Sequence, residues 1–489
     1  MNSEPDRPRL LRCKFFLEDS AALVREDIGV VVTRGHISAV TDYSQAAHLY
    51  PRLPVDELDG LVLPGFVDAH SHLRGLSLSE LGIDEGPLES WLLQLGVLPG
   101  LSPYHEALVA SYGLLSTGVT SVQAIHHTYA PLAGYVSEIE GLVEALTLTG
   151  IRCVLGLGVT DAAEYLPPPV PGVSVPELIT DYELPVYGIA AGEYEQLVRR
   201  ITGSVKLSND LLEFCLAPVA PQWCSDALLS LIASLSGSGC RVHTHLLESE
   251  FQREWLVADD PFSRLARFGL IGPRLSVAHG VWLDEDEITT LGSRGASIVH
   301  CPCSNERLEV GTGDVRRWIS SGVTVAVGTD GQWVGERPDL FAEMRAAIAQ
   351  SGRVGPRLTA REMFHIATRG GAAALGHENT GGALEIGRAA DLVCLEVDRS
   401  VALDEILSTM IESGRSDCVR DVMVGGTFRE RDWQWTITAE VSQARDYLRE
   451  QFGLVRVAAL ERLTQAIAAG AVLPAYLNDR RSALLRKES

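Results

Sequence analysis

The chain has 489 residues, 46% of them hydrophobic and 21% charged, which is typical of a folded globular protein with room for a large barrel and a small second domain. Sixty-four acidic residues against 41 basic ones give a formal net charge of −23, which disfavours binding to nucleic acid or to an anionic membrane surface. We find no long apolar segment, no secretory signal and no disulfide framework among the nine scattered cysteines, so a cytoplasmic protein is expected.

The two ends of the chain share one pattern. Residues 1–64 alternate short apolar runs with turns, which predicts small antiparallel strands. The same pattern returns in the stretch that begins Gly387-Arg-Ala-Ala-Asp-Leu-Val and in residues 419–427. We therefore expect residues 1–64 and 380–437 to form one discontinuous β-sandwich domain.

The middle of the chain, residues 65–379, alternates apolar β-rich runs with amphipathic segments such as 226–236 and 314–321. This alternation predicts a parallel sheet covered by helices, and eight strands favour a closed (β/α)₈ TIM barrel. The strands are expected to end near His70, Ile125, Val159, Val219, Leu246, His279, His300 and Asp330. Residues 438–489 form a charged, helical C-terminal extension, for which the sequence leaves open a dimer arm, a lid or a packed appendage.

Potential metal ligands close several of these strands. His70 and His72 are two residues apart, so in an extended backbone their rings point to the same side. Such a pair alone is more often structural than metal-binding. However, His245, His279 and Asp330 end the fifth, sixth and eighth strands, and the C-terminal strand ends of a barrel converge on one face. Four imidazoles and one carboxylate suit a divalent metal, with zinc favoured and iron as the alternative.

Six segments carry a family resemblance. They are Leu63-Pro-Gly-Phe-Val-Asp-Ala-His-Ser-His, Thr117-Gly-Val-Thr-Ser, Ala278-His-Gly-Val-Trp-Leu, His300-Cys-Pro-Cys-Ser-Asn, Gly328-Thr-Asp-Gly and Gly381-Gly-Ala-Leu-Glu-Ile-Gly-Arg-Ala-Ala-Asp-Leu-Val. In order and spacing they resemble the amidohydrolase superfamily, specifically its mononuclear aminohydrolase branch of cytosine, guanine and adenosyl-homocysteine deaminases and triazine hydrolases. The resemblance implies the barrel with its split sandwich. It also implies metal roles for His70, His72, His245, His279 and Asp330.

The number of metal ions follows from the fourth strand. Two-metal relatives carry a carboxylated lysine or a glutamate at the end of this strand. Here the strand is Phe214-Cys-Leu-Ala-Pro-Val-Ala, which offers no bridging ligand. One divalent metal per chain is therefore expected.

The resemblance also implies a reaction, the deamination of an amino-substituted nitrogen heterocycle by metal-bound hydroxide with release of ammonia. Asp330 would accept the proton of the water, and His279 would polarise or orient the attacked site. Glu248 follows His245 in His-Leu-Leu-Glu, the position of a proton-carrying glutamate in the deaminases, although a solvated helix glutamate is the alternative. His243, in Val-His-Thr-His, is a competing ligand that the family register disfavours.

Four residues are candidate substrate contacts. Trp91, in Gly86-Pro-Leu-Glu-Ser-Trp-Leu, resembles a tryptophan that covers the ring in related deaminases, although a core position suits it equally. His126 follows the second strand and Gln222 the fourth. His300 closes the seventh strand, and its side chain is expected to face the mouth of the barrel.

Two departures from the family pattern indicate an unusual substrate. Arg74-Gly75 follows the His-x-His pair almost at once, and Val219 stands where many relatives have a histidine. We therefore expect a small heterocyclic substrate of unassigned specificity. We also expect a homodimer. The same site could also expel chloride, an alkylamine or an amide nitrogen, as in triazine hydrolases. A non-catalytic scaffold is a remote alternative, because all the ligands and Glu248 are present.

Overall fold

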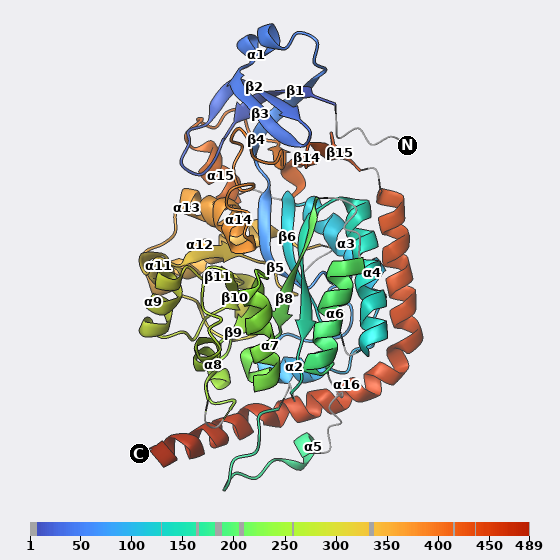
Figure 1. Cartoon of the computed structure of the whole chain (residues 1–489), viewed down its shortest axis with the longest axis vertical. Helices are drawn as coiled ribbons and strands as arrows, with labels where there is room; N and C mark the ends of the chain where they lie inside the picture. Colours follow the sequence, from blue (N-terminus) through green and yellow to red (C-terminus); the bar gives the residue numbers. More distant parts are fainter. Residues whose placement is uncertain are drawn as a thin grey trace.

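A closed barrel of eight parallel strands forms the centre of the protein (Figure 1). This computed structural model describes residues 7–128, 130–162, 166–180, 188–204, 210–256, 259–331, 337–413, 416–435 and 437–488. The barrel strands are β5 (Phe66–Ser71), β6 (Val119–His126), β7 (Arg152–Val159), β8 (Leu212–Pro218), β9 (Val242–Leu246), β10 (Leu275–His279), β11 (Ser297–His300) and β12 (Thr324–Val327). The predicted TIM barrel is confirmed. β12 ends three residues before the expected Asp330, and the other strands end within one residue of their expected positions.

The seam between the first and last strands closes beside the predicted metal ligands. Ser71 pairs with Asp330 in an isolated parallel bridge, and the Asp330 amide donates to the His70 carbonyl at 2.8 Å. Asp68 on β5 accepts hydrogen bonds from the backbone amide and the hydroxyl of Thr329, at 3.0 and 2.5 Å. The seam is therefore held by both backbone and side-chain hydrogen bonds.

Helices cover the outside of the barrel. They are α3 (Pro103–Leu115), α4 (Leu132–Thr149), α6 (Ala191–Ser204), α7 (Asp226–Gly237), α8 (Pro261–Arg267), α9 (Glu285–Arg294), α10 (Pro302–Arg307), α11 (Val315–Ser320), α12 (Leu340–Val354) and α13 (Ala360–His365). Side-chain caps fix the starts of several of them: Ser225 accepts from the Leu228 amide before α7, and Asp284 and Glu287 form a capping box before α9. A second core lies inside the barrel, where Val154, Val299 and Ala326 meet Ala372 of α14 (Gly371–Leu375).

The small domain is built from both ends of the chain, as predicted. Its strands are β1 (Arg9–Phe16), β2 (Arg25–Thr33), β3 (His36–Asp42), β4 (Val55–Pro64), β13 (Leu392–Leu395), β14 (Val419–Val424), β15 (Thr427–Arg431) and β16 (Gln434–Trp435), with α1 (Tyr43–Leu49) between β3 and β4. They form one sheet in the order β16-β15-β14-β13-β4-β1-β2-β3. The sheet folds back on itself, which brings Gly35 in the β2–β3 turn next to Gly425 in the β14–β15 turn. The two turns are so close that a Cβ on Gly35 would lie 2.9 Å from the Gly425 carbonyl oxygen. Leu11, Val30 and Met423 lie in the core that this curvature encloses.

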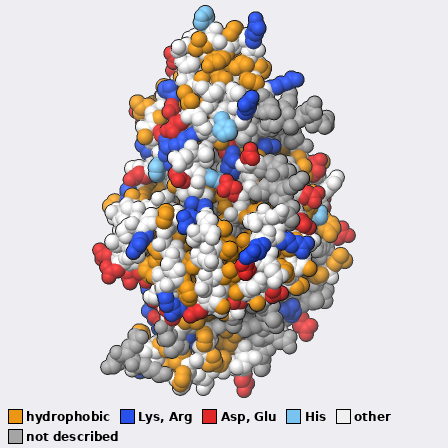
Figure 2. All heavy atoms as spheres, viewed as in Figure 1, with side chains coloured by type: hydrophobic (Ala, Val, Ile, Leu, Met, Phe, Trp, Pro, Cys, Tyr) orange, Lys and Arg blue, Asp and Glu red, His pale blue; other side chains and the backbone are white. Residues whose placement is uncertain are grey.

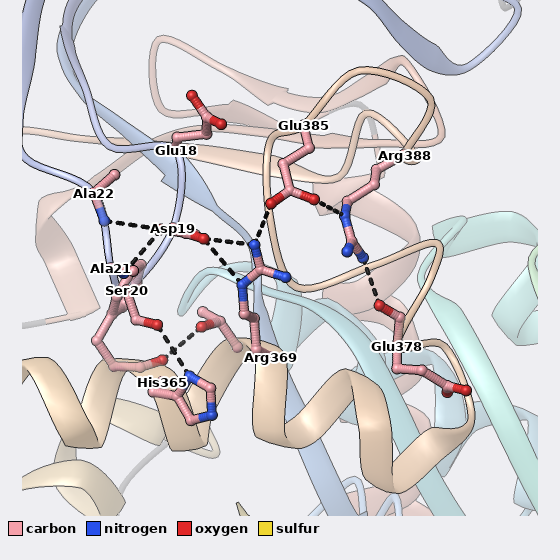
Figure 3. Close-up of polar contacts among 12 residues, drawn as sticks. Glu18, Asp19, Ser20, Ala21, Ala22, His365, Arg369, Glu378, Glu385 and Arg388 are labelled. Carbon is pink, nitrogen blue, oxygen red and sulfur yellow. Dashed lines mark hydrogen bonds and ion pairs between the residues drawn. The ribbon is translucent and has the colours of Figure 1, made fainter.

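A charged network pins the small domain to the barrel (Figure 3). Arg369 in the π-helix η4 (Ile366–Gly370) donates to Asp19 at 2.5 Å and also contacts Glu385. Glu385 in turn accepts from Arg388 at 2.7 Å, and the Ser20 hydroxyl lies 3.0 Å from His365 Nδ1. Since η4 packs against β5 and β12, the network connects the small domain to the two strands of the barrel seam.

The C-terminal extension is one long, bent helix, α16 (Thr438–Glu488), that packs on the barrel's own helices α2 (Leu88–Leu95), α3 and α5 (Glu177–Thr180). It runs down the side of the barrel and turns beneath its lower end in Figure 1. Pro474 lies within the helix and cannot donate to the Gly470 carbonyl, which instead accepts from the Ser90 hydroxyl of α2 at 2.8 Å. The contact with α2 therefore satisfies a carbonyl group that the proline leaves without its helical donor.

On the face shown in Figure 2, acidic and basic side chains are interspersed among apolar ones. In the described part of the chain, no helix has both the length and the apolar character needed to cross a membrane.

Candidate active site

Four potential metal ligands meet at the C-terminal end of the barrel. His70 ends β5, His72 follows it, His245 lies on β9 and Asp330 follows β12. Their ligating atoms all lie within 4.8 Å of one another. Asp330 Oδ1 is 3.4 Å from His70 Nε2 and 3.3 Å from His72 Nε2. Residues that are up to 260 positions apart in the sequence therefore form one cluster, as expected for converging strand ends.

His279 forms a second group, with Glu248 and Asp330, at the edge of this cluster. Its Nε2 lies 3.7 Å from Glu248 Oε1 and 3.9 Å from Asp330 Oδ2. Both His279 and Asp330 have left-handed backbones, with φ of 70° and 58°. Non-glycine residues adopt this conformation at an energetic cost, and it is common at functional sites, where it aims a side chain.

The orientation of two imidazoles is set by acceptors behind them. His245 Nδ1 lies 2.7 Å from the Val219 carbonyl, and His279 Nδ1 lies 2.9 Å from Asn305 Oδ1. Because both partners are acceptors, each Nδ1 carries the proton and each Nε2 keeps its lone pair. That lone pair is what a metal or a substrate proton requires.

His70 is held by a buried chain of hydrogen bonds. Its Nδ1 lies 2.8 Å from His243 Nε2, and His243 Nδ1 lies 2.8 Å from Ser276 Oγ. Ser276 Oγ also accepts from Gln123 Nε2 at 3.2 Å. His243 thus supports a neighbouring histidine and lies outside the cluster, whereas His245 lies within it.

The residues present fit a divalent metal. In the described part of the chain, the Nε2 atoms of His70 and His279 are buried and have no hydrogen-bond partner. Buried polar atoms are usually satisfied, so these lone pairs are available to a ligand. Three imidazoles and a carboxylate are a donor set that zinc and ferrous iron prefer.

The two carboxyl groups of the site are driven toward opposite protonation states. Burial raises the pKa of Glu248 well above its usual value, and the negative charges of Asp330 and Glu89 add to the rise. Burial acts in the same direction on Asp330, but the imidazoles of His70 and His72 beside it hold its pKa well below the usual value. A neutral carboxylic acid next to a carboxylate is a typical arrangement for acid–base catalysis.

A cavity of about 380 Å³ opens on this cluster. Trp91 of α2 and His126 at the end of β6 both line it, as the sequence predicts. Its apolar wall also includes Leu92, Val219 and Trp223, and its polar wall includes Arg74, Glu106, His126 and Glu138. Val219 stands where many relatives have a histidine, so this departure from the family pattern replaces a polar side chain with an apolar one in the cavity wall.

Two predicted substrate contacts do not line this cavity. The expectation that His300 faces the mouth of the barrel is wrong, because its ring lies edge-on to Trp318 of α11 with centroids 5.7 Å apart. Val299 and Cys301 on either side belong to the core inside the barrel, so strand alternation turns His300 toward the helices. Gln222, in the 3₁₀ helix η2 (Pro221–Trp223), is buried, and only its neighbour Trp223 reaches the cavity wall.

Several residues that support the site have no individual signal in the sequence. Ser304 donates to Asp330 Oδ2 at 2.5 Å, and Asn305 orients His279. Both lie in the segment His300-Cys-Pro-Cys-Ser-Asn, which carried the family resemblance but no individual roles. Arg74, whose position departs from the family spacing, lies in the cavity wall.

Comparisons with known proteins agree with this geometry. The model of the Amidohydrolase family matches residues 61–429. A 5-methylthioadenosine/S-adenosylhomocysteine deaminase of Syntrophobacter fumaroxidans is 28% identical over 438 residues, which cover 86% of this chain and 92% of the relative. A 5'-deoxyadenosine deaminase of Methanosphaera stadtmanae is 30% identical over 387 residues, covering 76% of this chain and 83% of the relative.

Two solved structures are similar as well. An adenosine deaminase from Xanthomonas campestris with bound zinc has a TM-score of 0.76 and 26% identity, and the match covers 93% of this chain and all of that one. A triazine hydrolase variant has a TM-score of 0.78 and 22% identity, covering 91% of this chain and all of that one.

Proposed function

Because the chain belongs to the amidohydrolase family, we propose that it is a metal-dependent aminohydrolase that converts an amino-substituted nitrogen heterocycle and water into the oxo-heterocycle and ammonia. The observation that carries the proposal is the position of Glu248, which lies in the cavity wall and 3.7 Å from His279 at the edge of the cluster. A carboxyl group so placed can exchange protons with a bound ring without serving as a ligand. The relatives named as deaminases, which match over most of their length, support the same reaction.

His70, His72, His245 and Asp330 would hold one divalent metal, with His279 at its edge and zinc favoured over iron. When bound, the metal would act as a Lewis acid that lowers the pKa of a coordinated water toward about 7. The end of β8 supports a single ion, because it presents Pro218 and Val219 where a bridging carboxylate would be needed.

The protein's own groups then manage the protons. Ionised Asp330 accepts one proton of the attacking water, while protonated Glu248 donates to the ring nitrogen next to the attacked carbon. A carbon–oxygen bond forms and the ring nitrogen gains a hydrogen. The amino group then leaves as ammonia with the proton that Asp330 accepted, and the remaining hydroxyl proton returns to Glu248 as the carbonyl forms. His279, with its Nδ1 fixed by Asn305, keeps the oxygen and the proton donor aligned.

The apolar side of the cavity suits the flat face of a heterocycle. Trp91 and Trp223 both line it, and aromatic rings stack favourably on planar ligands. The relatives' names make 5-methylthioadenosine, S-adenosylhomocysteine and 5'-deoxyadenosine the first compounds to test. Ammonia release from metal-loaded protein is the appropriate assay.

The variant Glu248→Gln tests the proposal. Glutamine keeps the shape and much of the hydrogen bonding of glutamate but cannot pass on a proton. We expect metal content to remain near that of the wild type while kcat falls by about 10²- to 10⁴-fold. Glu250→Gln is the matched control, because Glu250 pairs with Arg481 near the surface, and it should leave kcat nearly unchanged. A Glu248→Gln enzyme with full kcat would overturn the proposed mechanism.

A further inference from the structure

Arg74 places a charged hydrogen-bond donor beside the metal cluster. It lies two residues after His72 and lines the cavity. A Cβ added to Gly331 would lie 3.3 Å from Arg74 Nε and 3.4 Å from His72 Cδ2, so the arginine passes directly alongside a predicted metal ligand. The guanidinium therefore lies close to where a substrate atom would react.

The guanidinium of Arg74 has Glu106 as an electrostatic neighbour but no hydrogen-bond partner among the described residues. Within the described residues, Arg74 makes no hydrogen bond or ion pair, and its Nε is buried without an acceptor. Buried charged donors are nearly always paired, because an unpaired one loses its hydration without compensation. A buried N–H group on a cavity wall that has no acceptor is available to a ligand.

An acceptor lies on the same wall. Glu106 of α3 also lines the cavity, and burial raises its pKa although the charge of Arg74 opposes the rise. The neighbouring His126 is already engaged, since its Nε2 lies 2.9 Å from Glu138 Oε2. Arg74 and Glu106 therefore offer a ligand one donor and one acceptor at adjacent positions.

The charges of the wall indicate which ligand chemistry fits. Among the lining residues that the structure describes, Arg74 is the single arginine or lysine, and four are acidic, namely Glu106, Glu138, Glu248 and Asp330. A carboxylate or phosphate on the ligand would be repelled by the ionised members of this set, such as Asp330. A neutral acceptor avoids that repulsion. A carbonyl oxygen also has two lone pairs for the two parallel N–H groups of a guanidinium edge, whereas a ring nitrogen has one.

We propose that Arg74 is a substrate-anchoring residue, and that the preferred substrate is an amino-substituted heterocycle with a ring carbonyl. In such a cyclic amide the oxygen accepts from Arg74, and the adjacent N–H faces Glu106. The remaining walls, which are apolar and aromatic, contact the faces of the ring. This inference rests on the proposed aminohydrolase activity and adds to it a substrate class that 6-aminopurine nucleosides, which have no ring carbonyl, do not belong to.

Matched substrates test the inference directly. Ammonia release by the metal-loaded wild type is measured with cytosine, guanine and 2-amino-4-oxopteridine, which carry a ring carbonyl, and with adenine, 5'-deoxyadenosine and 5-methylthioadenosine, which do not. We expect the best compound of the first group to exceed every compound of the second by at least about 10²-fold in kcat/KM, because a site built to bind a polar group discriminates strongly against its absence.

Variants of Arg74 give the second arm. Arg74→Met should lower kcat/KM for the carbonyl substrates by about 10²- to 10⁴-fold, change it less than about threefold for the others and leave metal content unaltered. Arg74→Lys should recover part of the loss, because it keeps the charge but not the paired donors. The control Arg199→Met removes a largely exposed arginine of α6 and should have no effect.

The failures of the two proposals are distinguishable. If the wild type deaminates adenosine derivatives best, or if Arg74→Met affects both groups of substrates equally, the role of Arg74 is wrong while the aminohydrolase activity stands. If the metal-loaded wild type releases ammonia from no compound of either group, both the activity and the role of Arg74 are overturned.

Discussion

Arg480, near the end of α16, ties the C-terminal helix to the segment that carries Glu248. Its side chain is only 2% exposed, and it donates to the backbone carbonyls of Pro168 at 3.1 Å and Trp255 at 2.8 Å and to that of Glu254. The Trp255 ring in turn lies edge-on to Trp223 in the cavity wall, with centroids 5.9 Å apart. We therefore expect a substitution of Arg480 to alter the position of Glu248 and of the cavity wall.

The variant Arg480→Met keeps the apolar stem and removes every donor. A hydrogen bond from a charged group contributes about 1.5 to 3 kcal/mol, and an unsatisfied buried carbonyl costs about 1 to 3 kcal/mol. Pro168 and Glu254 are at least partly exposed and can regain water, whereas Trp255 is buried. Only the buried Trp255 carbonyl therefore bears the full cost of losing its donor. We expect the segment from residue 248 to 256 to be destabilised by about 2 to 4 kcal/mol.

Hydrogen exchange measures this destabilisation where it occurs. Since about 1.4 kcal/mol corresponds to a factor of ten, the amides of residues 248–256 should exchange about 30- to 1000-fold faster in Arg480→Met than in the wild type. A lower kcat with retained metal should accompany the change, because the same segment positions Glu248.

The neighbouring residue supplies the control. Arg481 forms ion pairs with Glu250 and Glu254 and has a side chain that is 31% exposed. Such pairs contribute at most about 1 kcal/mol, so Arg481→Met should accelerate exchange less than about fivefold. Equal exchange in Arg480→Met and the wild type, or equal acceleration in the two variants, would refute the reasoning.

Two further predictions concern the metal and acid stability. His243→Phe removes the partner of His70 Nδ1 and should weaken metal affinity by about 10- to 100-fold in a chelator competition, while unchanged affinity would show that His243 does not orient His70. The ion pair with Arg316 lowers the pKa of Glu362 from 4.5 to about 2, so its contribution to stability is complete above pH 4.5 and is lost as the pH falls toward 2. In calorimetry, the stability difference between the wild type and Glu362→Gln should therefore shrink over this interval, and a constant difference would contradict the assignment.

The barrel and its cluster were predictable because their signals are local. His70, His72 and His245 lie at strand ends that apolar runs mark clearly, and the barrel topology brings such ends together, although the choice of His245 over His243 required the family resemblance. Asn305 and Ser304 were not predictable as individual supports. Their roles depend on distances across the site, which the sequence does not specify.

The direction of His300 was a different problem. β11 has only four residues, so its alternation gives little indication of which face turns inward, and a shift by one residue reverses every side chain. The function of α16 was equally hidden. A charged helix with an internal proline fits several roles, and its contacts with α2 and with the carbonyl groups near Glu248 show only that it packs on the barrel.

The seam of the barrel has a mechanical consequence. The joint between β5 and β12 is made by the Ser71–Asp330 bridge and the Asp330–His70 hydrogen bond, at the same place as the ligand cluster. An ion bound to His70, His72 and Asp330 would thus cross-link the first and last strands of the barrel, where the ring of strands closes. A chain that lost its ion would lose this cross-link together with its activity. The seam between β5 and β12 would then open before the rest of the barrel. Proteases that sample such openings would then remove empty chains in preference to loaded ones.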